Sequence, residues 1–145
     1  MANPNIVNVV TIGSGNALWH LQTDGDDKLT VEADKILKIN SILASNVDGS
    51  ASKSVSVAII KTVNTTPTPN NLDVASGLER DYGESAPGAG TQTFYIVKAV
   101  KVPALDVLII LDTSIYLMET DVLQALCVET NDKIDLLVSY EVISV

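Results

Sequence analysis

The feature that most constrains the fold of this chain is a period of two in its apolar residues. Val55, Val57 and Ile59 alternate with serine and alanine, and another extended run covers residues 134–143. A further run places four apolar residues on one parity: Phe94, Ile96, Val100 and Val102. Successive side chains of a strand point to opposite faces, so this alternation is typical of strands with one buried face.

Turn-forming residues separate the apolar runs. Gly13-Ser14-Gly15 follows the run 6–12, Asp24-Gly25-Asp26 lies further along, and Asp48-Gly49-Ser50 precedes the run that contains Val55. Asx-Gly pairs between apolar runs favour hairpins. Short strands at this spacing predict an antiparallel β-sandwich, jelly-roll-like, with roughly seven or more strands.

One segment, residues 31–43, fits two readings. Ile36, Ile39 and Leu43 lie near helical spacing, whereas Leu37, Ile39 and Leu43 share the parity of a strand. The β character of the neighbouring segments favours the strand. In the last strand, which we expect to end at Ser139-Tyr140-Glu141, Tyr140 shares the parity of the core residues and should point inward.

The length, composition and net charge of the chain limit the number of domains and the classes of binding partner. The chain has 145 residues, which suits a single domain over residues 1–145, and its 46% apolar content with 4% aromatics predicts an aliphatic core. A net charge of −9 argues against binding to nucleic acid or to an anionic membrane surface. No apolar run is long enough to span a bilayer, and no signal peptide is evident, so we expect synthesis in a cytoplasm.

A long loop is expected at residues 64–92, which are rich in proline and glycine. Loops of this length are uncommon unless they are functional or disordered. The loop could be a tolerated insertion, or its apolar residues could anchor it on a neighbouring subunit. The candidate interface residues are Leu72, Val74, Leu78 and Tyr82.

The residues that could carry chemistry do not form a recognisable active site. One histidine, His20, and one cysteine, Cys127, provide too few ligands for zinc, and Cys127 lies in an apolar run, where we expect it to be buried. Because Cys127 is the single cysteine of the chain, an intrachain disulfide is excluded. Asp24, Asp26 and Asp27 suggest calcium, but Lys28 stands where a further oxygen ligand would be needed.

Two further patterns are better explained without catalysis. Gly13-Ser14-Gly15 lacks the third glycine of a dinucleotide-binding loop. Glu119 and Asp121 are expected to form a solvated acidic hairpin tip and not a glycosidase pair. We therefore expect no enzyme activity, no cofactor and no bound metal.

Several short segments, in their order along the chain, resemble a known family. They are Met1 to Val9, Lys38 to Leu43, Ser45 to Gly49, Val102-Pro103-Ala104, Asp112 to Leu117, Glu119-Thr120-Asp121 and Val138 to Glu141. The chain is similar to small virion-associated proteins of tailed phages of cyanobacteria and other marine bacteria. The family-like pattern would place glycine near position 120, where this chain has Thr120, and the loop 64–92 resembles an insertion.

The resemblance implies a structural protein of the phage virion. Our first expectation is a capsid decoration or cement protein that contacts copies of itself, as a homotrimer, and the major capsid protein. The alternative is a neck, tail or fibre-associated component that binds a host-surface glycan. The trimer is implied by the resemblance alone, since decoration proteins commonly occupy local threefold positions.

Overall fold

The computed structural model describes residues 12–63 and 90–144, and these residues form nine strands and no helix. The strands are β1 (Ile12–His20), β2 (Asp27–Thr30), β3 (Lys35–Asn46), β4 (Lys53–Val63), β5 (Gly90–Val102), β6 (Val107–Leu111), β7 (Ile115–Leu117), β8 (Val122–Cys127) and β9 (Ile134–Ser144). Residues 31–43 thus contribute to a strand and not to a helix. Within the described ranges, no helix could cross a membrane.

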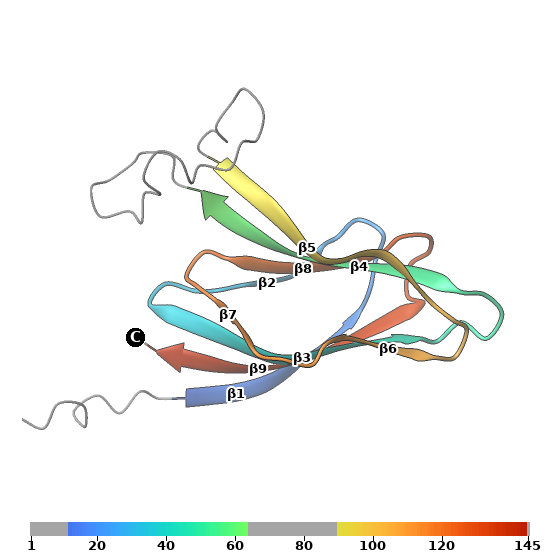
Figure 1. Ribbon diagram of the computed structural model, residues 1–145, viewed down its shortest axis with the longest axis horizontal. Helices are drawn as coiled ribbons and strands as arrows, with labels where there is room; N and C mark the ends of the chain where they lie inside the picture. Colours follow the sequence, from blue (N-terminus) through green and yellow to red (C-terminus); the bar gives the residue numbers. More distant parts are fainter. Residues whose placement is uncertain (1–11, 64–89, 145) are drawn as a thin grey trace, which may run out of the picture.

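The strands form two antiparallel sheets that pack face to face (Figure 1). Sheet A has the order β1-β9-β3-β6, with β7 also paired to β3, and sheet B has the order β2-β8-β4-β5. The prediction of an antiparallel β-sandwich is therefore confirmed.

The pairing follows that of one long double-stranded ribbon folded over itself. The first strand pairs with the last, β2 pairs with β8, β3 pairs with β6 and β7, and β4 pairs with β5. The folded ribbon closes through two further pairings, β3 with β9 and β4 with β8. This connectivity is that of a jelly roll.

The core between the sheets is aliphatic, as the composition predicts. Its fully buried side chains come from both sheets and from the β1–β2 connection, and they include Leu21, Ile39, Ile42, Leu123, Ile134, Leu136 and Val138. Burying each such side chain contributes about 1.5–3 kcal/mol. Cys127 is buried in this core as a small apolar residue.

A one-residue bulge in β3 changes which side chains face the core. Ile39 pairs with Tyr140 but Ser41 pairs with Ser139, so Asn40 has no residue opposite it. Leu37 and Ile39 point inward before the bulge, and Ile42 and Ala44 point inward after it. The expectation that Leu43 shares the face of Leu37 and Ile39 is therefore wrong, because the extra residue reverses the parity.

The predicted turn at Gly13-Ser14-Gly15 is also wrong, since β1 continues through these residues. Gly15 pairs with Tyr140, and a Cβ on Gly15 would lie 2.8 Å from the Tyr140 hydroxyl oxygen. The glycine thus makes room for the tyrosine ring, which packs against the core as expected. The last strand continues three residues beyond Glu141, to Ser144.

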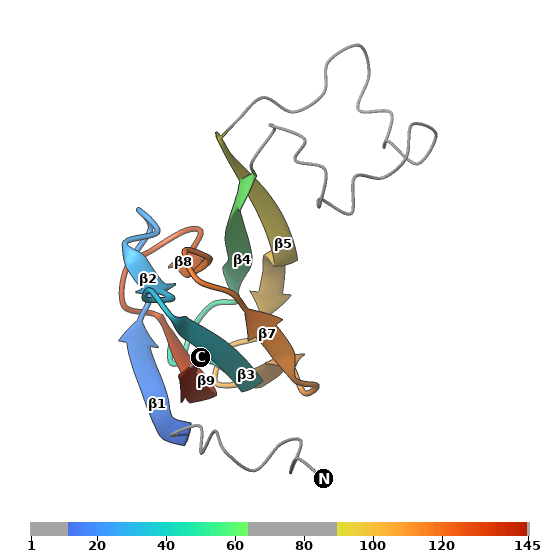
Figure 2. The same cartoon turned by 90° about the vertical axis from the view of Figure 1, so that its left-hand side faces the viewer.

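Strand β5 is an irregular edge strand with exposed apolar side chains. Its pairing with β4 shifts twice, and Ala99 adopts a φ of 50°. Of the four residues expected on one face, Val102 is buried but Phe94 is 65% exposed. The strand begins at Gly90, so the connection from β4 is residues 64–89 and lies outside the described residues. Past Ile60, β4 pairs with β5 and no longer with β8, so the β4–β5 pair extends past the other two strands of sheet B (Figure 2).

We expect Gly15→Ala to destabilise the protein by about 1–3 kcal/mol, because the added methyl group overlaps the Tyr140 ring. Urea unfolding measures this cost, with Gly13→Ala as a matched control whose Cβ would lie 3.9 Å from Val142. In a Tyr140→Ala background the cost of Gly15→Ala should mostly disappear. An equal cost in both backgrounds would show that the contact is absent.

We expect Thr120→Gly to stabilise the protein by about 0.5–1 kcal/mol. Thr120 has a φ of 71°, a left-handed conformation that a β-branched residue adopts at a cost and glycine adopts freely. Thr113→Gly is the control, since Thr113 has no positive φ and its replacement should destabilise slightly. A loss of stability in Thr120→Gly would contradict this conformation.

Candidate interaction surface

The predicted interface residues Leu72, Val74, Leu78 and Tyr82 lie outside the described residues. A contact between chains through residues 64–92 therefore stays a prediction. The described residues present other surfaces.

His20 lies on the outer face of sheet A, where it joins β1 to β9. Its Nδ1 lies 2.8 Å from Asp135 Oδ1, and the side chain is exposed. The hydrogen bond and the negative charge of Asp135 hold the pKa of His20 above its usual range. Cys127, by contrast, faces the core, so the structure does not bring His20 and Cys127 together.

The acidic residues that suggested calcium hold turns through hydrogen bonds to the backbone. Asp24 Oδ1 accepts a hydrogen bond of 3.1 Å from the Asp26 amide, and Asp27 Oδ2 accepts one of 3.0 Å from the Gln22 amide. Gly25, between them, has a φ of 73°, as the turn requires. These contacts give the carboxylates a structural role in the β1–β2 connection.

The expectation of a solvated acidic tip at Glu119 and Asp121 is wrong for Asp121, which is 4% exposed. Its Oδ2 accepts hydrogen bonds from Lys61 Nζ at 2.7 Å and from the Met118 amide at 2.9 Å. Glu119 instead accepts a hydrogen bond from the Asp34 amide at 3.1 Å. Asp121 thus ties β4 to the β7–β8 turn, which its spacing in the sequence could not reveal.

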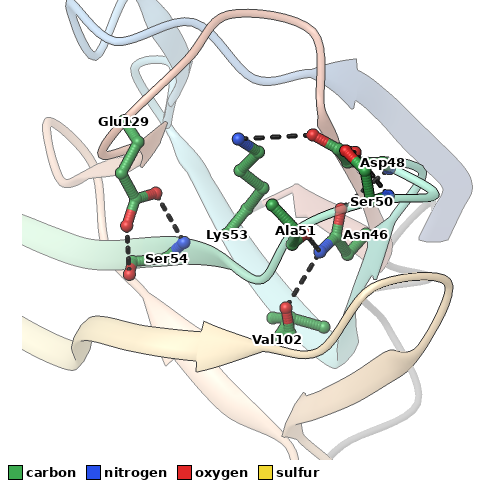
Figure 3. Close-up of polar contacts among 8 residues, drawn as sticks. All are labelled: Asn46, Asp48, Ser50, Ala51, Lys53, Ser54, Val102 and Glu129. Atoms are coloured by element: carbon green, nitrogen blue, oxygen red, sulfur yellow. Dashed lines mark hydrogen bonds and ion pairs between the residues drawn. The ribbon is translucent and has the colours of Figure 1, made fainter.

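A polar network closes one end of the sandwich (Figure 3). The buried Asn46 side chain donates 2.9 Å hydrogen bonds to the carbonyl oxygens of Ala51 and Val102, which links β3 to β5. Its Oδ1 accepts a hydrogen bond from the Asp48 amide, and Asp48 Oδ1 in turn accepts from Ser50. The network therefore shapes the β3–β4 turn.

Two carboxylates in this network have lowered pKa values. Hydrogen bonds from the Ser50 hydroxyl and amide, and Lys53 at 3.3 Å, lower the pKa of Asp48. Burial raises the pKa of Glu129, but hydrogen bonds from the Ser54 hydroxyl and amide outweigh burial and lower it overall. Both carboxylates therefore stabilise the fold in their charged form.

An apolar row crosses the outer face of sheet A, and we call it the leucine row. It consists of Leu18, Leu137, Leu43 and Ile109, which are consecutive cross-strand partners on β1, β9, β3 and β6. Leu18 is 60% exposed, Ile109 is 63% exposed, and Leu137 is 39% exposed. Side chains paired across strands lie within contact distance, so the row forms one continuous apolar patch. The row could not be predicted from the sequence, because the bulge at Asn40 places Leu43 outward.

Each of two acidic side chains on the same face is paired with a basic side chain, and His20 carries a positive charge when it is protonated. Besides His20 with Asp135, Lys38 Nζ lies 3.3 Å from Glu141 Oε2. The leucine row lies between these two pairs, since Asp135 and Glu141 are on either side of Leu137 along β9. The face is therefore nearly neutral, although the chain carries a net charge of −9.

A polar groove of about 410 Å³ lies on sheet A near the bulge. Its lining comes from β1, β3 and β9 and comprises Ser14, Gly15, Asn16, Asn40, Ser139, Tyr140 and Glu141. The serine, asparagine and glutamate side chains offer hydrogen-bond donors and acceptors for a polar ligand.

No protein-family model, curated protein or solved structure matches the chain.

We expect the protein to lose stability as the pH falls below about 4.5, because protonation removes the stabilising charge of Asp48 and Glu129. Asp48→Asn should lower the melting temperature at pH 7, and its difference from the parent should shrink at pH 3. The exposed Asp112 provides a control, Asp112→Asn. A difference that does not change with pH would contradict the assigned role of Asp48.

Proposed function

We propose that the protein is a non-enzymatic structural component of a phage virion, a capsid decoration or cement protein that acts through protein–protein contacts. The observation that carries this proposal is the leucine row, in which the exposed Leu18, Leu137 and Ile109 and the half-buried Leu43 are continuous across four strands. Contiguous exposed apolar patches mark interaction sites on soluble proteins. The partners proposed are further copies of the chain and the major capsid protein.

The scaffold beneath the row suits this function because it is rigid. The row lies on β9 and β3, which are paired along nearly their whole length and bury Leu136, Val138, Ile42 and Ala44 on their other face. A pre-organised surface loses little conformational entropy when it binds. The acidic charge of the chain also limits adhesion to nucleic acid, which is useful for a protein that assembles beside a packaged genome.

A second candidate function is a neck, tail or fibre-associated component that binds a host-surface glycan. The polar groove favours it, because Asn16, Asn40 and Ser139 present amide and hydroxyl groups to a volume large enough for a sugar ring. A glycan array with the purified protein tests this function. Binding that Asn40→Ala abolishes, with the fold intact, would favour this candidate over the decoration protein.

We expect the chain in purified phage particles, at a copy number comparable with that of the major capsid protein. Quantitative mass spectrometry of particles of the encoding phage measures this ratio. A low copy number would favour the neck or tail, and absence from washed particles would contradict the proposal. Detection of the chain in a lysate of infected cells is the control, since it shows that the protein is synthesised.

A further inference from the structure

We propose that the outer face of sheet A packs against the same face of a second copy of this chain, with the leucine row supplying the apolar part of the contact. This contact deepens the proposed function, since it says how two copies of the chain meet, and the mass in solution tests it separately from the presence of the chain in virions. It rests on three observations: the position of the row, the pairing of charge around it, and the size of the face.

The row crosses the whole width of the face, from β1 to β6. Leu137 and Leu43 lie on the two inner strands, with Leu18 and Ile109 on the strands that flank them. Two sheets pack face to face at about 10 Å when their facing side chains are apolar. A second copy of the row supplies such side chains, and water is displaced from both.

Charge does not oppose a second copy at this face. Two chains of net charge −9 repel each other, and like charges brought together across an interface are unfavourable. On sheet A the charges beside the row are paired within each chain, as His20 with Asp135 and Lys38 with Glu141. A second copy therefore meets a nearly neutral surface there and incurs little repulsion.

The size of the face is sufficient for a specific contact. Four strands spaced at about 4.8 Å and about nine residues long cover roughly 600 Å² per copy. Specific interfaces bury about 1,200–2,000 Å² in total, so the face reaches the lower end of that range. We therefore expect a reversible dimer.

A patch that binds its own copy generates a two-fold axis, so each substitution acts on both sides of the contact. This arrangement differs from the threefold ring that the family resemblance implies. The mass of the assembly in solution distinguishes the two arrangements.

The test is sedimentation equilibrium of the full-length chain up to about 0.5 mM, a concentration at which weak dimers are populated. The expected mass is that of a dimer. Leu137→Lys should raise the dissociation constant roughly tenfold or more, because it buries an unpaired charge from each copy. Leu18→Lys tests the same face at a more exposed edge position, where the fold tolerates lysine more easily.

Leu105→Lys is the matched control, since Leu105 is exposed in the turn between β5 and β6 and is not part of the row. It should leave the dissociation constant unchanged. Thermal melts confirm that each variant is folded. A monomer at the highest concentration, a trimer, or a dimer that Leu18→Lys and Leu137→Lys do not weaken more than Leu105→Lys would overturn the proposal.

Discussion

The pairing of β9 with β3 is the interaction on which the rest of the structure depends. Strand β9 lies between β1 and β3, and these two strands have no other connection within sheet A. Residues from the end of the described chain thus complete a sheet whose other strands come from its beginning and middle. Pairing between residues so distant in sequence forms after a large loss of chain entropy, so it requires the burial of Leu136, Val138 and Ile42 between the sheets.

The bulge at Asn40 links this pairing to the surface of the molecule. Because the extra residue lies within β3, Ile39 and Ile42 both face the core, and Leu43 faces outward beside Leu137. The same residue lines the polar groove with Ser139. A single irregularity therefore shapes both surfaces that could bind a partner, which agrees with the frequent occurrence of bulges near functional sites.

The alternation of apolar residues was enough to predict the sandwich, because burial of one face determines which residues lie inside each regular strand. The alternation was not enough to predict which side chains face the core where the register of strand pairing shifts. The extra residue at Asn40 has no signature in the chain, so the outward position of Leu43 could not be predicted. Phe94 pairs with the buried Ile59 and keeps the predicted parity, but it is exposed on the edge strand β5. Gly15 was misread because its role depends on Tyr140, which is distant in sequence.

The most direct test of this account is the register between β3 and β9, measured by cross-strand nuclear Overhauser effects in solution. The account predicts contacts of Ile39 with Tyr140 and of Leu43 with Leu137, a register that shifts by one residue at Asn40. If Ile39 and Leu43 instead showed one unbroken register with β9, Leu43 would face the core. The leucine row would then not exist, and the proposed contact would have no basis.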